Sequence, residues 1–259
     1  MKIRAIILSA LILCGISAVI MYSRAAQPQQ KSSVITQAIN DKNTPMVIKN
    51  LILKMKEQME VNDDQFPELI KEVENYTNSC ADSASVAVLH SMLAEMYQNY
   101  YQRNQWTINQ RTQLSGYIPE DIRVWTSNLF TDKIKEEIDL SLRPTALLQN
   151  TPVSKFKDIL EIGKDSQTLR PTLYEFLAFR ALDIQPTVQI YKDLIAFQNK
   201  EPNMKSVLLT ELDYLRFLYG DKRDKESFEA YMNALDELYR NLASQKLCRR
   251  DLNRQNWIG

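Results

Sequence analysis

The sequence predicts an all-α protein, in which successive antiparallel helical hairpins form a repeat-like, α-solenoid-like array around a buried central helix. Three observations lead to this prediction. Glycine is scarce, with 5 residues in a chain of 259, so β-hairpin turns would lack their usual residue. No long stretch alternates apolar and polar residues, as half-buried strands do. Apolar residues instead recur at helical spacing, in segments separated by prolines.

The predicted central helix lies within residues 170–183. Apolar side chains cover nearly its whole circumference, because only Glu175 and Arg180 interrupt the run from 173 to 182. A surface helix has a single apolar stripe, so this helix needs neighbours on several sides. Thr172 and Glu175 have the spacing of a capping box, which sets the start of the helix.

Amphipathic helices are predicted before this segment. Residues 46–59 and 65–76 each carry one apolar face at helical spacing. Four X-Pro pairs are interpreted as helix boundaries, since proline suits the first helical position and threonine can cap it. The four pairs are Thr44-Pro45, Phe66-Pro67, Ile118-Pro119 and Thr151-Pro152.

Two apolar stripes near the C-terminus predict a further antiparallel hairpin. Gly220 separates them and is the predicted left-handed helix cap. No regular 34-residue tetratricopeptide signature accompanies the hairpins, so the array is repeat-like only. The first stripe comprises Leu208, Leu212, Leu215 and Leu218; the second comprises Phe228, Tyr231, Met232, Leu235, Leu238, Tyr239 and Leu242.

Residues 1–26 are predicted to direct export rather than to join the fold. Two basic residues precede an uncharged run over 5–22, and small residues at 23 and 25 permit cleavage after Ala25. The run is also long enough to span a bilayer, so an uncleaved membrane anchor stays an alternative. A lipoprotein site at Cys14 is the weakest alternative, because a leucine precedes that cysteine.

The rest of the chain is divided into a polar linker (27–33), a helical domain (34–245) and an irregular basic tail (246–259). The helical part is large enough for one domain or for two closely packed lobes. The chain has 32 basic and 32 acidic residues. Three basic residues lie before Gln27 and the first acid is Asp41, so the chain from Gln27 onwards is mildly acidic. Nucleic-acid binding, which normally needs a basic face, is therefore not expected.

No catalytic, cofactor-binding or metal-ligating residue is predicted, and the chain is not expected to be an enzyme. His90 is the single histidine, which excludes two-histidine zinc motifs and favours a structural role. Glycines are too dispersed for a phosphate-binding loop. The adjacent acids Asp63-Asp64 and Glu136-Glu137 are interpreted as helix-start or solvated charges rather than acid–base pairs.

Several other side chains are interpreted as architecture. Glu175, Arg180 and Asp183 are expected to pair internally or to reach solvent. Cys80 and Cys248 either pair in an oxidising compartment or stay separate thiols. Aromatic core packing is expected for the group Tyr97, Tyr100, Tyr101, Arg103, Trp106 and Arg111, and burial on one helical face is expected for Ile122, Trp125 and Leu129.

The sequence contains several aromatic-rich strings between about residues 85 and 185. The strings are 89–101 (LHSMLAEMYQNYY), 104–106 (NQW), 111–112 (RT), 119–126 (PEDIRVWT), 132–134 (DKI), 141–142 (SL) and 169–183 (LRPTLYEFLAFRALD). In their order they resemble the N-terminal helical region of the large bacterial alpha-2-macroglobulin-like proteins. The resemblance implies an exported, often membrane-attached protein that inhibits endopeptidases by entrapment, in which a bait segment is cut and the molecule closes on the peptidase.

The chain also departs from that family. The β-sandwich domains and bait region are not expected here, and neither Cys80 nor Cys248 precedes the Gly-Glu-Gln of the family's thioester motif. No trapping residue is therefore carried over, and the tail is interpreted as a truncated end. The expected function is that of an N-terminal helical module with a docking or presentation role and no inhibition of its own.

The alternative function is a free-standing helical-repeat adaptor of the cell envelope. Either function places the protein in the periplasm or envelope of a bacterium. The expected partners are proteins: adjoining macroglobulin domains or envelope proteins, and peptidases for a complete family member. No cofactor is expected.

Overall fold

The computed structural model describes residues 43–61, 65–112, 117–160, 163, 165–200, 203–220 and 224–255. Regular structure in these ranges is helical, which confirms the predicted all-α class. The β-type pairing found there is one isolated bridge, between Pro152 and Thr172. Contacts divide the chain into two compact units. Unit 1 runs to Leu147 and includes Ser154–Ile162, whereas unit 2 comprises Leu148–Val153 and the chain from Gly163 onwards.

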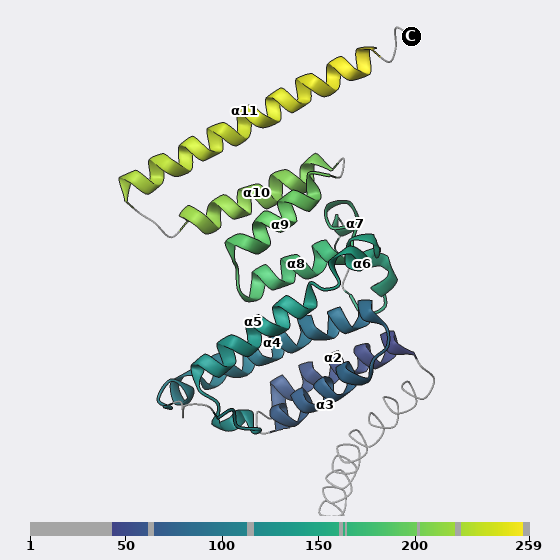
Figure 1. The fold of residues 1–259 in the computed structure, drawn as a ribbon, viewed down its shortest axis with the longest axis vertical. Helices are drawn as coiled ribbons and strands as arrows, with labels where there is room; N and C mark the ends of the chain where they lie inside the picture. Colours follow the sequence, from purple (N-terminus) through teal and green to yellow (C-terminus); the bar gives the residue numbers. More distant parts are fainter. Residues whose placement is uncertain are drawn as a thin grey trace, which may run out of the picture. The chain divides into compact units, whose positions relative to one another are not determined.

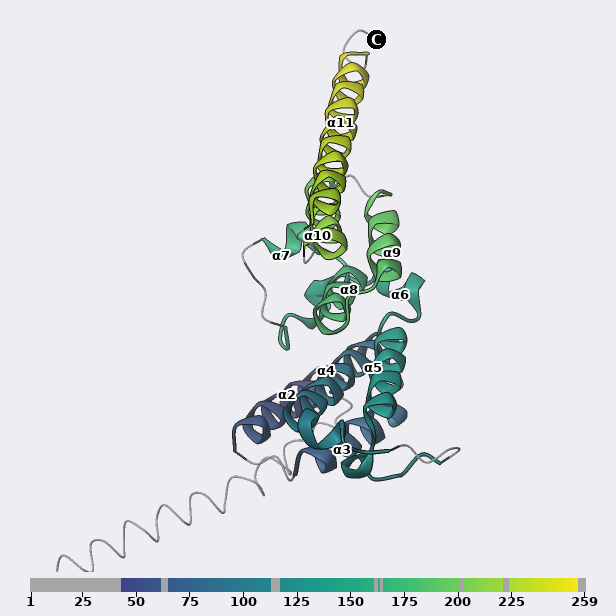
Figure 2. The same cartoon turned by 90° about the vertical axis from the view of Figure 1, so that its left-hand side faces the viewer.

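Unit 1 is a set of helices packed on the long helix α4 (Figure 1). Helix α4 contacts α5 on one side and the α2–α3 hairpin on the other. The view in Figure 2 shows the same order from the side. The elements are α2 (Thr44–Val61), α3 (Phe66–Ser79), α4 (Ser83–Ile108), the 3₁₀ helix η2 (Ile122–Val124) and α5 (Ser127–Ser141), while α6 (Thr145–Asn150) and the 3₁₀ helix η3 (Val153–Phe156) are each divided between the two units.

Helix α4 is central in unit 1 because apolar side chains on most of its circumference are buried. Asp82 fixes its start, since the Asp82 carboxylate accepts hydrogen bonds from the backbone N–H of Ser85 at 3.3 Å and from its hydroxyl at 2.6 Å. Buried apolar residues of α4 include Ala84, Ala87, Val88, Leu89, Met92, Leu93, Ala94, Met96, Tyr97 and Tyr100.

Trp125 is buried, as predicted, but it does not lie on an α-helical face. It caps the C-terminal end of η2, and α5 starts two residues later, so Trp125 and Leu129 share no helix. Its ring stacks on Tyr97 with centroids 5.7 Å apart, and its Nε1 donates to the Pro119 carbonyl at 2.7 Å. Tertiary contacts, rather than helical periodicity, bury this side chain.

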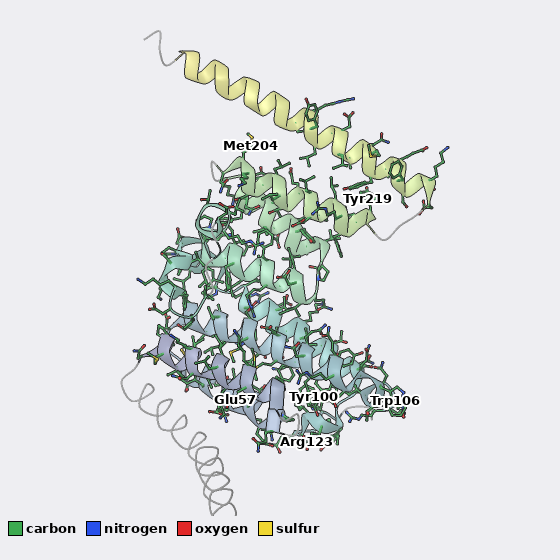
Figure 3. All side chains as sticks on the ribbon, turned by 180° about the vertical axis from the view of Figure 1, so that it is seen from behind. Glu57, Tyr100, Trp106, Arg123, Met204 and Tyr219 are labelled. Carbon is green, nitrogen blue, oxygen red and sulfur yellow. The ribbon has the colours of Figure 1, made fainter. Side chains whose placement is uncertain are left out.

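The predicted aromatic packing is correct for Tyr97 and Tyr100 and wrong for Trp106. Tyr97 and Tyr100 are buried, and both lie beside the Phe130 ring of α5. Trp106 lies near the end of α4, where its side chain is 79% exposed (Figure 3). Its helical spacing from Tyr97 does not bring it under a neighbouring element.

Unit 2 contains α8, α9, α10 and α11, each of which packs on the next (Figure 1). The capping box predicted for α8 is present: the Thr172 hydroxyl accepts from the Glu175 N–H at 3.2 Å, and the Glu175 carboxylate accepts from the Thr172 N–H at 3.1 Å. Most of α8 is buried, as predicted. The elements are α7 (Ser166–Leu169), α8 (Leu173–Ile184), α9 (Val188–Gln198), α10 (Met204–Tyr219) and α11 (Lys225–Gln255).

Three of the predicted helix boundaries are wrong in detail. Asn43, not Thr44, caps α2, through its Oδ1 and the Met46 N–H at 3.2 Å. Thr151 was predicted to cap a helix, but its carbonyl accepts from the Leu173 N–H at 2.8 Å. The chain before Val153 therefore pairs with the segment around Leu173 and does not start an α-helix. Gly220 has φ −60° and ψ −31°, a right-handed conformation, and therefore forms no left-handed cap. The boundary at Phe66-Pro67 is confirmed by the start of α3.

Candidate functional site

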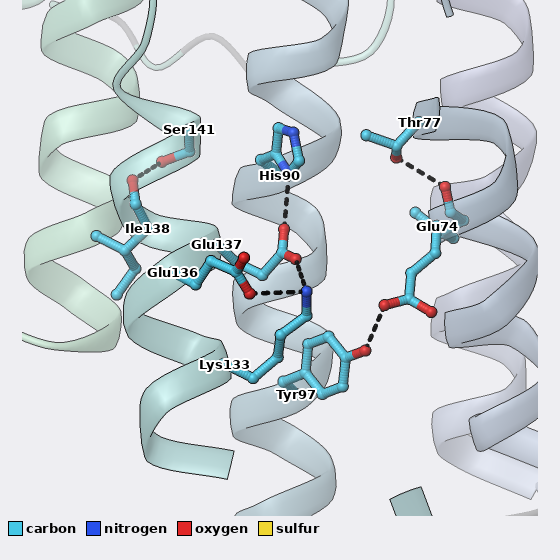
Figure 4. Close-up of polar contacts among 10 residues, drawn as sticks. Glu74, Thr77, His90, Tyr97, Lys133, Glu136, Glu137, Ile138 and Ser141 are labelled. Carbon is cyan, nitrogen blue, oxygen red and sulfur yellow. Dashed lines mark hydrogen bonds and ion pairs between the residues drawn. The ribbon is translucent and has the colours of Figure 1, made fainter. Parts of the chain in front are cut away.

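A cluster of ionisable side chains in unit 1 surrounds Glu137 on α5 (Figure 4). The Glu137 carboxylate lies 2.7 Å from Nδ1 of His90 on α4 and 2.8 Å from the Lys133 ammonium one turn earlier. Lys133 also reaches Glu136, at 3.0 Å. Glu137 is buried, whereas Glu136 is exposed. The interpretation of the Glu136-Glu137 pair as solvated charges is therefore wrong for Glu137.

The charges around Glu137 favour its ionised form. Burial by itself raises the pKa of this carboxyl, but the hydrogen bonds and positive charges at His90 and Lys133 outweigh burial and lower the pKa below 4.5. Burial lowers the Lys133 pKa in turn, and its two carboxylate partners raise it overall. The cluster thus ties α4 to α5 with internally paired charges, which is a structural arrangement.

A second polar contact in unit 1 joins α3 and α4. The Tyr97 hydroxyl donates to the Glu74 carboxylate at 2.6 Å (Figure 4). Burial, and then the adjacent Glu74 charge, raise the pKa of Tyr97, so the phenol remains protonated and continues to donate. This contact joins two helices of unit 1.

The charged residues singled out in 170–183 pair internally or reach solvent, as predicted. Glu175 is buried and accepts from the amide of Gln198 on α9 at 3.1 Å. The Gln198 amide oxygen accepts from the Thr210 hydroxyl on α10 at 2.8 Å. A chain of buried hydrogen bonds therefore connects α8, α9 and α10. Arg180 is half-buried near Phe176, and Asp183 is exposed.

A groove in unit 2 is a candidate binding site. It has a cavity volume of about 460 Å³, within the range of roughly 300–1,000 Å³ found for ligand pockets. Each of three helices contributes one face, with residues three or four positions apart. The lining residues are Lys192, Ile195, Ala196 and Asn199 of α9, Glu211, Tyr214 and Leu215 of α10, and Ala234, Glu237, Leu238 and Asn241 of α11.

The side chains of the groove are distributed like those of a protein interface. Ile195, Leu215 and Leu238 are half-buried and supply apolar surface from all three helices. Exposed polar residues, including Lys192 and Glu237, lie on the flanking helices. An apolar centre with a polar rim is the usual anatomy of a surface that binds another protein.

Glu211 is the unusual residue of this groove. It lies on the same face of α10 as Tyr214 and Leu215, and burial raises the pKa of its carboxyl. Within the described part of the chain, no hydrogen bond or ion pair reaches this carboxylate, not even from Lys192 across the groove. Water is therefore the hydrogen-bond partner left to this half-buried carboxylate, and a charged group of a bound protein could replace it.

The groove was not predicted from the sequence, because the apolar stripes near the C-terminus predict buried surface. All four leucines of the first stripe are only half-buried, and α10 buries Ser206, Val207 and Thr210 instead. In the second stripe, Phe228, Met232 and Tyr239 are 60%, 48% and 71% exposed. The side chain of Leu242 lies outside the described residues. The sequence does contain one indication that this stripe is not fully buried, because the charged Glu211 lies within it, between Leu208 and Leu215.

Of the two predicted thiols, Cys80 is half-buried, with Sγ 3.9 Å from the Asp82 carbonyl oxygen. The side chain of Cys248 lies outside the described residues, as do Asp63-Asp64 and residues 1–26. No group of three or more potential ligand residues for a metal occurs in the described ranges. None of the helices described here has the length and apolar character needed to cross a bilayer.

Comparisons with protein-family models, with curated proteins and with solved structures returned no match to this chain. The resemblance to alpha-2-macroglobulin-like proteins therefore depends on the sequence strings alone. Many residues of those strings have structural positions in unit 1, including Tyr97 and Trp125 in its core.

Proposed function

We propose that this chain is an exported helical docking module that binds another protein through unit 2. The observation that carries the proposal is the groove of α9, α10 and α11, with its apolar centre, polar rim and unpartnered Glu211. Exposed Phe228, Met232 and Tyr239 on α11 add apolar surface that a partner would cover.

We propose further that the partner is the remainder of an alpha-2-macroglobulin-like endopeptidase inhibitor. The aromatic-rich strings between residues 85 and 185 support this identity of the partner, and the helices would present the inhibitor at the bacterial envelope. A free-standing envelope adaptor is the alternative, and it would use the same groove for a different protein. The two alternatives differ in the identity of the bound protein and not in the binding surface.

The docking function can be tested with a variant that blocks the groove. Ala234 lines its α11 wall, so Ala234→Arg places a long charged side chain there without removing a core contact. Complexes are extracted from producing cells in mild detergent and sized under native conditions. We expect the wild-type chain to elute in a larger complex and the variant to elute alone. Asp132→Arg, at an exposed position of α5, is the matched control. Equal complexes for all three proteins would contradict the proposal.

If the partner is the remainder of such an inhibitor, the isolated chain should not inhibit peptidases. Entrapment needs a cleavable bait coupled to closure of a shell, and we propose that both functions lie outside this chain. Incubation of the purified chain with several endopeptidases at equimolar ratio should therefore leave their cleavage of a protein substrate unchanged and yield no covalent adduct on a denaturing gel. Stoichiometric inhibition or a shifted covalent band would contradict it.

A further inference from the structure

We propose that the groove of unit 2 binds an amphipathic helix of the partner protein, and that a lysine or arginine on the apolar face of this helix pairs with Glu211. The inference depends on the docking function proposed above and names the chemistry of the partner. Three features of the groove support it: its shape, the position of its small residues and its charge.

The shape of the groove suits a helix. The lining residues of α9 span from Lys192 to Asn199 and those of α11 span from Ala234 to Asn241, each covering two helical turns. Two turns of helix extend about 11 Å. Helix-in-groove recognition uses anchors at positions i, i+3, i+4 and i+7 over this length, so the walls offer a matching contact surface.

Small residues on both walls provide space for the partner. Ala196 on α9 and Ala234 on α11 line the groove, while Tyr214 and Leu215 come from α10 at its floor. The distance between packed helices depends on side-chain size at the contact and is shortest where these residues are small. The alanines therefore allow a partner helix to approach the floor, where Glu211 lies.

The charge of the groove selects a cation. Its lining contains two carboxylates, Glu211 and Glu237, and one ammonium group, Lys192. Glu237 is exposed and solvated, whereas Glu211 is half-buried and burial raises its pKa. A cation of the partner would compensate the Glu211 carboxylate for the hydration that it loses through partial burial. The ring of Tyr214, one turn along the same face, would give the cation a second favourable contact.

The test uses the full chain and three synthetic peptides of one amphipathic Ala/Leu design, each stapled to hold a helix. The peptides differ at one central position of the apolar face, which is Lys, Met or Glu. Dye-labelled peptides are titrated with the protein, and binding is followed by fluorescence anisotropy. We expect the Lys peptide to bind about tenfold or more tightly than the Met peptide, as a charged hydrogen bond allows. The Glu peptide should bind most weakly.

Two variants locate the cation. Glu211→Gln keeps the shape of the side chain and should abolish the preference for Lys over Met. Glu237→Gln is the matched control at an exposed lining position and should keep that preference. Glu211→Gln should also fold normally, with a urea midpoint equal to or above that of the wild type, because it removes an unpartnered charge.

The outcomes separate this inference from the docking function. Equal binding of the Lys and Met peptides would overturn the pairing with Glu211 while leaving docking in place. A preference for Lys that persists in Glu211→Gln would also overturn it, by placing the cation elsewhere. Failure of all three peptides to bind would overturn the helix-binding inference, and an unchanged native complex in Ala234→Arg would then extend the failure to docking itself.

Discussion

Replacement of Trp125 by alanine should destabilise unit 1 more than any other single aromatic change at its η2–α5 junction. The side chain is only 9% exposed, stacks on Tyr97 and lies 5.3 Å from Phe130 between ring centroids. An aromatic side chain of this size buries roughly 200 Å², equivalent to at most about 5 kcal/mol of hydrophobic free energy. Measured truncations of buried aromatics cost about 3–5 kcal/mol, which is the loss expected here.

The hydrogen bond of Trp125 can be separated from its packing. Trp125→Phe retains an aromatic ring but removes the donor to the Pro119 carbonyl. The expected loss is about 1–2 kcal/mol, a typical value for one hydrogen bond together with a small packing change. Trp106→Ala is the matched control, because Trp106 is exposed and its removal should change stability by less than about 0.5 kcal/mol.

Amide hydrogen exchange in α4 measures the stability of unit 1 without interference from unit 2. The slowest amides of this helix should report the unfolding of unit 1, and their opening free energies should fall in the order wild type, Trp125→Phe, Trp125→Ala. Equal amide protection in Trp125→Ala and Trp106→Ala would contradict this prediction. It would show that the buried aromatic stack contributes no more to the stability of unit 1 than an exposed ring does.

Two further predictions concern the buried polar contacts. The lowered pKa of Glu137 means that its contribution to stability is present above about pH 4.5 and is lost as the pH falls through the folded-state pKa. Glu137→Gln should therefore be less stable at pH 7 and should flatten the dependence of the urea midpoint on pH between 7 and about 3; an unchanged slope would contradict this. Glu175→Ala removes the carboxylate half of the α8 capping box and the partner of Gln198, so it should destabilise unit 2 by about 2–4 kcal/mol in urea unfolding. Asp183→Ala, at an exposed position of the same helix, should have little effect, and equal losses in the two variants would argue against the network.

Local chemistry made much of the fold predictable. The capping box at Thr172 and Glu175 depends on residues three positions apart, and the apolar faces of α2 and α3 depend on helical period, so short-range sequence contains both. The all-α class follows from the same periodicity together with the scarcity of glycine.

Features that depend on tertiary contacts were not predictable in this way. Trp125 is buried by Tyr97, far away in sequence, and Glu137 is buried because His90 of another helix supplies a partner. Periodicity cannot say whether a neighbour covers an apolar stripe. It therefore identified the stripes of α10 and α11 but could not show that much of their surface stays exposed, which is the property that suggests docking.

Photo-crosslinking in producing cells can show whether the groove of α9, α10 and α11 holds a partner helix, as we propose. A photoreactive amino acid is placed at Ala196 or Ala234 on the groove walls, or at exposed Asp132 of α5 as the control. Crosslinked peptides are then sequenced. We predict one discrete product from both groove positions and none from the control, joined to an amphipathic segment with a lysine or arginine on its apolar face, and loss of this product in Glu211→Lys. No product from the groove, or the same products from Asp132, would contradict the account.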